Sequence, residues 1–395
     1  MRAAWLVGFF GAYGLLAVVH WAAWRWLVQA VPRWIIRYRR VTLAIFLLLF
    51  CLPLARPVSF FYPRVAVFSI VTAFGMLWHL GVAMTMAIIG LVRAGRALES
   101  KWARHRGVPP LDAALLDRRQ VLERTVGAVA FAASSATLGW GTLRGRYEWS
   151  VEEVAIRLPK LPKALDGFTI VQLSDLHVGT FIGERELDMG LGLLQRIRPD
   201  LIAITGDIVD ADPRYVPIAA RRLGALAARE GVVCIPGNHD YYTGENAVLG
   251  GMRRAGIDVL VNRGRVIAPG DGGGFALLGV DDLSARAGRG HAMGPDLALA
   301  QSMVPPDRAS VLLAHQPRFA AVAARAGVDL QLSGHTHGGQ INPGFRPIDL
   351  FFRYVSGRYQ VGSMQLYVNR GFGTVGPPTR VGAPPEITKI VLVAG

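Results

Sequence analysis

The sequence predicts an α/β domain that follows an N-terminal membrane region of about four transmembrane helices. Four apolar runs, separated by segments that contain arginine, lie within residues 1–146. From residue 147 onward, short apolar runs alternate with polar turns and helical patterns, which is typical of an α/β sheet. Hydrophobic residues make up 52% of the chain and charged residues 18%, a balance too apolar for a wholly soluble protein. We therefore divide the chain into a transmembrane region, 1–146, and a second domain, 147–395.

The apolar runs differ in how well they fit a membrane span. They lie near residues 3–24, 41–60, 65–92 and 125–143. A spanning helix needs about 20 apolar residues, which the first and third runs supply. The second run is strongly apolar only up to Ala55 and spans only if it extends to Phe60 and Phe61. The fourth run, rich in Ala, Gly and Ser, is the least hydrophobic.

The basic residues between the runs predict an orientation. The first and third loops are rich in arginine, whereas the second contains only Arg56 and Arg64. The positive-inside rule therefore places the first and third loops in the cytoplasm and the second domain outside it. Arg118 and Arg119 loosely resemble a twin-arginine export signal. Ordinary positive-inside charges are the simpler interpretation, and both interpretations give the same topology.

The charge distribution argues against a nucleic-acid-binding protein, and the cysteine content argues against a disulfide-stabilised one. The net charge is +15, but many of the arginines lie between the apolar runs, and no basic block interleaved with aromatic residues is present. No nucleic-acid partner is therefore expected. The two cysteines, Cys51 and Cys234, cannot form a disulfide framework, and we expect both to be buried thiols.

In the second domain, polar clusters follow five apolar runs where strands are expected to end. They are Ser174-Asp175-Leu176-His177, Gly206-Asp207, Pro236-Gly237-Asn238-His239-Asp240, Ala314-His315 and Ser333-Gly334-His335-Thr336-His337. Residues 184–198 and 215–229 show the three- and four-residue apolar spacing of helices. Because ligands bind beyond the carboxyl ends of strands in such sheets, we expect the five clusters to converge there. Three later apolar runs, at 275–280, 364–368 and 387–393, predict a second sheet packed on the first.

The clusters contain the side chains that a metal centre requires. Their aspartate, asparagine and histidine residues are oxygen and imidazole ligands, which suit Mn, Fe, Zn or Ni. An aspartate can bridge two cations through its two oxygens. Two divalent metal ions a few ångströms apart can clamp a phosphoryl group and lower the pKa of a shared water, which yields a hydroxide nucleophile near neutral pH. Each cluster alone is more often an ordinary polar turn, but five of them at strand ends favour a metal centre.

These motifs resemble those of the calcineurin-like metallophosphoesterases. The order and spacing of the clusters match that family from Phe168 onward. The resemblance implies a two-sheet sandwich flanked by helices. The stretches Gly338-Gly339-Gln340-Ile341 and Pro384-Pro385-Glu386-Ile387 are similar to those of a bacterial branch whose members are membrane-anchored or exported. With its N-terminal apolar runs, the chain is similar to transmembrane proteins with a metallophosphoesterase domain.

The resemblance also implies a role for each site residue. Asp175, His177 and His337 would hold one metal ion, and Asn238, His315 and His335 the other. Asp207 would bridge the two ions. His239 would donate a proton to the leaving oxygen or a hydrogen bond to the phosphate, and Asp240 would orient His239.

Several other residues have alternative interpretations. His20 and His79 lie in spanning runs, where helix contact is the simpler interpretation and a functional site the alternative. His105 and His291 are expected in loops. Arg370 and Arg380 flank a glycine-rich turn and either meet a phosphate or are solvated surface residues.

The predicted function is metal-dependent hydrolysis of phosphomonoester, phosphodiester or pyrophosphate bonds by a membrane-anchored enzyme. Its partners would be the lipid bilayer and a phosphate ester, including a lipid-linked or envelope component. The resemblance also admits a hydrolase of a lipid-linked nucleotide-sugar pyrophosphate, similar to UDP-diacylglucosamine. A membrane sensor or transporter with a regulatory phosphoesterase domain is an alternative of another class. A binding module without catalysis is disfavoured by the complete ligand set.

Overall fold

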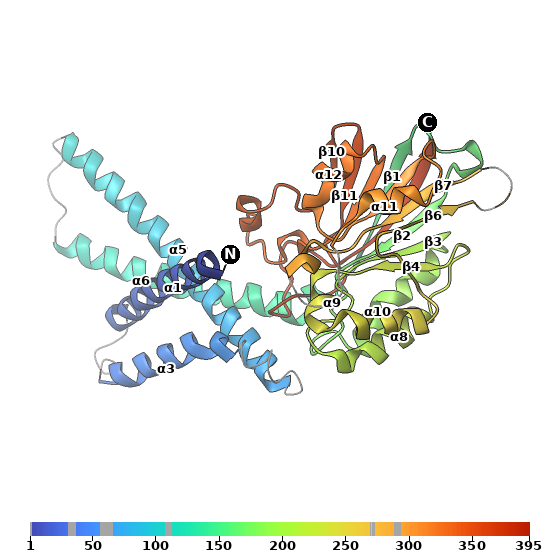
Figure 1. The fold of residues 1–395 in the computed structure, drawn as a ribbon. Coiled ribbons are helices and arrows are strands. Elements are labelled where there is room, and N and C mark those ends of the chain that lie inside the picture. Colours follow the sequence, from blue (N-terminus) through green and yellow to red (C-terminus); the bar gives the residue numbers. More distant parts are fainter. Residues whose placement is uncertain are drawn as a thin grey trace. The chain divides into compact units, whose positions relative to one another are not determined.

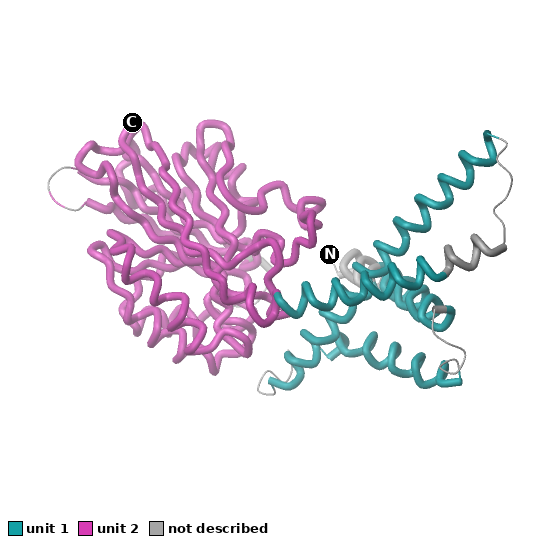
Figure 2. The backbone as a smooth tube through the Cα atoms, turned by 180° about the vertical axis from the view of Figure 1, so that it is seen from behind, with its two compact units in different colours: residues 1–140 teal, residues 141–395 magenta. Residues whose placement is uncertain are grey.

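The fold divides the chain into two compact units. A computed structural model describes residues 2–30, 37–55, 66–106, 113–268, 270, 273–287 and 294–395. The first unit comprises residues 1–140 and the second residues 141–395 (Figure 2). The functional assignment of 1–146 and 147–395 as transmembrane and catalytic domains stays a prediction.

The first unit is helical. Its long helices are α1 (Arg2–Ala30), α3 (Arg39–Cys51), α5 (Ala66–His105) and α6 (Ala113–Leu143). At the end of α3, Pro53 lies in a short 3-10 helix, since proline cannot donate the backbone hydrogen bond of a continuing α-helix. Pro53 packs against α5 where Gly75 leaves no side chain in the way.

Within the described residues, two helical segments are long and apolar enough to cross a membrane. They are Ala66–His105 and Val121–Tyr147. The 13 residues of α3 extend only about 20 Å, which is less than the thickness of a bilayer core. The part of the predicted second span beyond Ala55, including Phe60 and Phe61, lies outside the described residues, as do Arg56 and Arg64. A membrane region of four spans therefore stays a prediction.

The second unit is an α/β sandwich of two mixed sheets (Figure 1). The first sheet has the order β1 (Ser150–Leu158), β12 (Glu386–Ala394), β2 (Thr169–Leu173), β3 (Leu201–Thr205), β4 (Val232–Ile235), β5 (Asp258–Val259). The second has the order β10 (Gly357–Val361), β11 (Met364–Val368), β9 (Leu330–Ser333), β8 (Ser310–Leu313), β7 (Phe275–Gly279), β6 (Arg263–Ile267).

The strand register confirms part of the predicted sheet assignment and corrects the rest. β2, β3, β4 and β5 are parallel, and the predicted strands at 275–280 and 364–368 form β7 and β11 of the second sheet. The strand predicted at 387–393 was assigned to the second sheet, and that assignment is wrong. It is β12, which lies in the first sheet, parallel to β1 and antiparallel to β2. Apolar alternation predicts a strand but does not say which sheet it joins.

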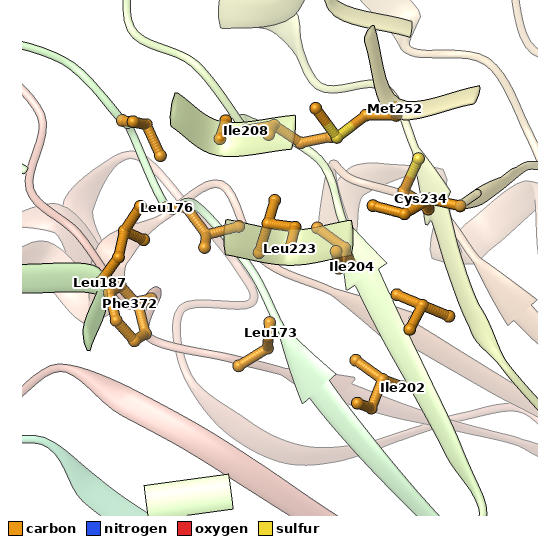
Figure 3. Close-up of a cluster of buried hydrophobic side chains, with 14 of the residues drawn as sticks. Leu173, Leu176, Leu187, Ile202, Ile204, Ile208, Leu223, Cys234, Met252 and Phe372 are labelled. Carbon is orange, nitrogen blue, oxygen red and sulfur yellow. The ribbon is translucent and has the colours of Figure 1, made fainter. Parts of the chain in front are cut away.

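Apolar side chains fill the space between the sheets and cover their outer faces. Ile170, Leu201 and Val233 of the first sheet share one buried cluster with Leu277 and Val311 of the second. The outer face of the first sheet is covered by α7 (Glu184–Leu191), α8 (Val216–Gly224) and α10 (Glu245–Arg254), as Figure 3 shows for Leu187, Leu223 and Met252. Short helices α11 (Leu297–Ser302) and α12 (Ala320–Arg325) pack on the second sheet.

Two predicted helices are shorter than their periodicity suggested. The pattern over 184–198 begins as α7 but continues as a 3-10 helix, Gly192–Arg196. The pattern over 215–229 forms an α-helix only from Val216 to Gly224, where a Cβ atom on Gly224 would overlap Ala255. Of the two cysteines, Cys234 is buried as predicted, but Cys51 is exposed because α3 buries none of its side chains.

Candidate metal centre

The predicted ligands lie on tight turns directly after strands. Asp175, His177, Asp207, His335 and His337 all have positive φ values, between 48° and 73°. Left-handed backbone is unfavourable for residues with a side chain and tends to occur at functional sites. The turns that carry these residues directly follow β2, β3 and β9, and their potential ligand atoms lie close together.

Five strands from both sheets bring the clusters together. The sequence predicted convergence at the carboxyl end of a parallel sheet, and β2, β3 and β4 provide it in the first sheet. β8 and β9, which precede His315 and His335, belong to the second sheet. The site therefore lies where the two sheets meet, a feature that the linear order of motifs did not show.

One group of ligands consists of Asp175, His177 and His337. Its three potential ligand atoms lie within 4.8 Å of one another. The Nε2 atoms of His177 and His337 are 3.1 Å apart, and His337 Nε2 is 3.4 Å from Asp175 Oδ1. The carboxylate of Asp175 accepts hydrogen bonds from the Ser174 hydroxyl and the backbone N–H of His335, which fix its orientation.

A second group consists of Asp207, His315 and His335. His315 Nε2 lies 3.3 Å from Asp207 Oδ2 and 3.3 Å from His335 Nδ1. The other nitrogen of His315 is 2.8 Å from the Thr205 carbonyl, to which it donates. This contact fixes the ring and directs Nε2 toward Asp207 and His335.

The carboxylate of Asp207 connects the two groups. Its Oδ2 atom is 3.3 Å from His315 Nε2 and 3.6 Å from His177 Nε2, and its Oδ1 atom accepts the His239 backbone N–H. Burial by itself raises the pKa of Asp207, but the surrounding histidines, His315 first, bring it well below its usual range. The Asp207 charge in turn raises the pKa of His315 well above its ordinary value, against the effect of burial. A negative charge is thus held between imidazoles, as a bridging ligand requires.

The donor set fits two divalent cations. Asn238 Oδ1 is a buried acceptor atom with no hydrogen-bond partner among the described residues. Unpaired buried acceptors are unfavourable unless something else occupies their lone pairs. Burial lowers the pKa of His335 to about 4 and that of His337 well below its ordinary value, which keeps both rings neutral. Neutral imidazoles and carboxylate oxygens are ligands for first-row transition metals.

Gly334 allows the second-sheet histidines to approach the first sheet. A Cβ atom on Gly334 would overlap the Ser174 hydroxyl and the Asp175 carboxylate. Only glycine fits between β9 and the turn after β2, which explains why this residue precedes the paired histidines.

His239 has a different carboxylate partner from the one predicted. Its Nδ1 atom lies 2.8 Å from Asp210 Oδ1, and its ring is beside that of His177. Asp240, assigned to orient His239, instead accepts the backbone N–H groups of Gly237, Ile208 and Val209. The assignment of Asp240 is therefore corrected: its side chain holds the turns after β3 and β4 together. Burial, then the Asp207 charge, raise its pKa to about 7.

Asp210 was not predicted as a site residue, because it lies outside the five polar clusters at the strand ends. It follows an isolated bridge between Val178 and Val209, three residues after Asp207. Burial raises the pKa of Asp210, but the nearby rings of His177 and His239 bring it below its usual range. Its Oδ1 atom is 2.8 Å from His239 Nδ1 and 3.8 Å from His177 Nδ1. The sequence feature that could have indicated Asp210 is a second aspartate three residues after the Gly206-Asp207 motif.

The two arginines near the site are held by other protein groups, with Arg380 buried and Arg370 partly exposed. Arg380 is 1% exposed and donates to the carbonyls of His337, Arg370, Gly371 and Gly373. Its Nη2 atom is 3.1 Å from His337 Nδ1. Burial lowers the pKa of Arg380 to about 9, so it remains charged at neutral pH. Arg370 pairs with Glu152 and Glu386. Phosphate contact and a solvated surface position were the two predictions for these arginines. The structure instead gives both of them a structural role.

The other described histidines, His20, His79 and His105, belong to the first unit. His20 of α1 and His79 of α5 are buried together, with His79 Nδ1 3.1 Å from His20 Nε2, which fits the helix-contact interpretation. His105 ends α5 instead of lying in a loop, and His291 lies outside the described residues.

Known proteins match both the site and much of the chain. The family described as "Calcineurin-like phosphoesterase" matches residues 168–339, which include every predicted ligand. An uncharacterized metallophosphoesterase of Bacillus subtilis is 36% identical over 290 residues, which cover 70% of this chain and 98% of that protein. The chain belongs to the calcineurin-like metallophosphoesterase family. It is accordingly a hydrolase of phosphate ester bonds, of a family that uses two divalent metal ions.

Two vertebrate relatives are named for a membrane region. A transmembrane protein with metallophosphoesterase domain from Bos taurus is 34% identical over 263 residues, 64% of this chain and 59% of that protein. The protein of that name from Danio rerio is 33% identical over 291 residues, 70% of this chain and 67% of that protein. The alignment thus spans about three fifths of the bovine metallophosphoesterase.

Proposed function

We propose that this metallophosphoesterase is anchored in a membrane and hydrolyses its ester with a water-derived nucleophile at a two-metal centre. The observation that carries the proposal is the position of Asp207 Oδ2, within 3.6 Å of His177 Nε2 and 3.3 Å of His315 Nε2. Only a residue between two ligand groups can serve both.

The ligand assignment follows from the two groups. Asp175, His177 and His337 would hold one cation. Asn238, His315 and His335 would hold the other, and Asp207 would serve both. The Asn238 assignment is supported by its unpaired buried Oδ1 atom. Two divalent cations, when bound there, would neutralise the charge of the phosphoryl group and lower the pKa of the attacking water.

His239 is the residue that we assign to the substrate. Asn238 and His239 begin α9 (Asn238–Thr243), so their side chains leave the first turn of the helix in different directions. Asp210 holds His239 Nδ1, which directs Nε2 away from that carboxylate. We propose that Nε2 donates to the phosphoryl or leaving oxygen. Asp210 is then a positioning residue for His239.

Membrane anchoring is supported by two apolar helical segments in the described residues and by the names of the vertebrate relatives. The second unit is here called the catalytic unit. We retain its placement outside the cytoplasm, which the arginine-rich first and third loops predict. A substrate at the membrane surface, such as a lipid-linked or envelope phosphate ester, fits this placement.

The proposal is tested with His239→Ala in the full chain, reconstituted and loaded with Mn²⁺, Fe²⁺, Zn²⁺ or Ni²⁺. The variant should keep both metals by elemental analysis and lose about a hundredfold in turnover on esters with poor leaving groups. The loss should be smaller for a nitrophenyl ester, which needs little protonation. His105→Ala, outside the second unit, is the matched control. Unchanged turnover on both ester types would remove His239 from the mechanism, and inactivity of the parent chain on every ester would refute the proposed function.

A further inference from the structure

Residues 344–353 of the second unit, here called the apolar loop, carry large apolar side chains that are exposed. Leu350 is 83% exposed and Phe351 81%, which makes them the two most exposed large apolar side chains that the structure describes. Phe345 is 65% exposed. The segment, orange in Figure 1, precedes β10. Its tip is a short 3-10 helix, Pro347–Leu350, held by hydrogen bonds from Arg346 to Asp349 and Ser356. Adjacent exposed apolar residues on an ordered loop indicate an interaction surface.

Backbone contacts connect the apolar loop to the point where the chain enters the catalytic unit. The end of α6, at Gly141–Leu143, belongs to that unit and to the second apolar helical segment. The carbonyl of Gly141 accepts the Arg380 N–H, and Thr142 Oγ1 is 2.5 Å from Thr379 Oγ1. A Cβ on Gly141 would overlap residues 379–381, so this contact requires glycine.

The same stretch pairs with the chain that leads into the apolar loop. Val381 N–H donates to the Gln340 carbonyl, and Asn342 N–H donates to the Val381 carbonyl. The apolar loop begins two residues after Asn342. Within the catalytic unit, the apolar loop and the end of α6 are thus joined through a single layer of backbone, 379–381.

The apolar loop also adjoins the metal centre. The Phe352 ring is 6.0 Å from the His335 ring, centroid to centroid, and Thr336 Oγ1 donates to the Val355 carbonyl. Arg380, which belongs to the 379–381 layer, contacts His337. His335 therefore has a neighbour in the apolar loop, and His337 has one in the backbone layer that joins this loop to α6.

We propose that the apolar loop inserts into the lipid bilayer and that the enzyme's substrate is a phosphate ester in the headgroup of an amphipathic lipid. The occupant is lipid and not a protein partner, because the apolar loop is joined to the end of the chain's own predicted span. Leu143, on that end, is also strongly exposed. Arg353 follows the tip and suits an anionic lipid surface, since basic side chains at this depth contact headgroup phosphates.

The inference rests on the proposed function and adds the substrate class to it. A lipid held by its acyl chains in the bilayer would present its phosphate beside Phe352 and His335 without leaving the membrane. Hydrolysis then forms a bond from water oxygen to phosphorus and breaks the bond from phosphorus to the lipid oxygen. That oxygen takes up a proton, so the lipid alcohol stays in the membrane and the phosphate departs.

The depth of the apolar loop in the bilayer is measured on the full chain in phosphatidylcholine–phosphatidic acid vesicles. Phe351→Cys in a Cys51→Ser background carries a spin label, and its collision rates with oxygen and with a water-soluble nickel chelate are compared. Val322→Cys, on an apolar residue of α12 that is 42% exposed, is the matched control. The label at position 351 should collide more often with oxygen than with the chelate, as labels buried in lipid do. The label at position 322 should collide more often with the chelate. Equal values at the two positions would overturn the insertion.

Activity is measured in the same vesicles. The ratio of turnover on phosphatidic acid to turnover on soluble nitrophenyl phosphate should fall at least tenfold in the double variant Leu350→Ser, Phe351→Ser, and should not change in Val322→Ser. An unchanged ratio would overturn the lipid substrate. Absence of hydrolysis on both esters in the parent chain would instead refute the proposed function, while the depth measurement would still decide whether the apolar loop inserts.

Discussion

At the scale of single residues, the ligand types and their order were predictable, but their supporting side chains were not. Asp175, Asp207 and His315 follow strands with short motifs between them, so the sequence could place them at one end of a sheet. Asp210 and Arg380 could not be placed in this way, since each acts through a contact that depends on the fold. Asp210 reaches His239 only because β3 and β4 are neighbours.

The bridging assignment predicts a loss of both metal ions in Asp207→Ala. Removing the shared carboxylate takes a ligand from each cation. Elemental analysis of the purified full chain should show little of either metal. Asp212→Ala, which removes another buried carboxylate, should retain both, and His335→Ala should release mainly one. Full metal content in Asp207→Ala would show that the bridge is misassigned.

The positioning role of Asp210 predicts a specific pattern of kinetics. Asp210→Ala should lower kcat about tenfold or more with little change in KM, because partners that orient a functional histidine are typically worth that much. Asp210→Asn keeps a hydrogen-bond acceptor and should recover part of the loss. In a His239→Ala background, Asp210→Ala should have almost no further effect. Additive losses at constant metal content would mean that Asp210 does not act through His239.

At the scale of elements, the parallel strands of the first sheet were predictable because each ends in a polar cluster. β12 was misassigned because its apolar pattern is the same whichever sheet it joins. The structure shows what fixes its position. Glu386, at the start of β12, is buried and accepts hydrogen bonds from Tyr367 of β11 and from Thr388. This polar cluster connects the two sheets across the core.

Tyr367→Phe should therefore destabilise the catalytic unit. The hydroxyl of Tyr367 is 2.7 Å from Glu386 Oε1, and a hydrogen bond to a charged group contributes about 1.5–3 kcal/mol. The midpoint of urea unfolding, followed by tryptophan fluorescence, should shift to lower urea. Tyr242→Phe, at a half-exposed tyrosine, should shift the midpoint by less than a quarter as much. Equal midpoints for Tyr367→Phe and the parent chain would show that the hydroxyl is not needed to join the sheets.

At the scale of the whole molecule, sequence reasoning separated an apolar helical part from an α/β part. The compact units meet at residues 140–141, whereas composition suggested 146–147, because the last turn of α6 packs with residues 379–381 of the catalytic unit. Composition reports the hydrophobicity of a helix but not the tertiary contacts of its end.

The arrangement of basic loops predicts a sided labelling pattern. In intact spheroplasts, a membrane-impermeant thiol reagent should modify Ser284→Cys but not Ser100→Cys, both in a Cys51→Ser background. After the membrane is breached, both should react. The remaining natural thiol, Cys234, is buried and gives a low background in folded protein. The reverse pattern would place the catalytic unit in the cytoplasm.

The central position of β12 has a consequence for the order in which the protein can form. β12 lies between β1 and β2, and its contacts with β1 join residues about 236 positions apart in the chain. Pairings of such long sequence separation form slowly. Until residues 386–394 have left the ribosome, β1 has no strand to pair with, and one edge of β2 stays open. The helices of the first unit are complete more than 200 residues earlier, so the nascent chain can be integrated into a membrane while its catalytic unit is still unfinished.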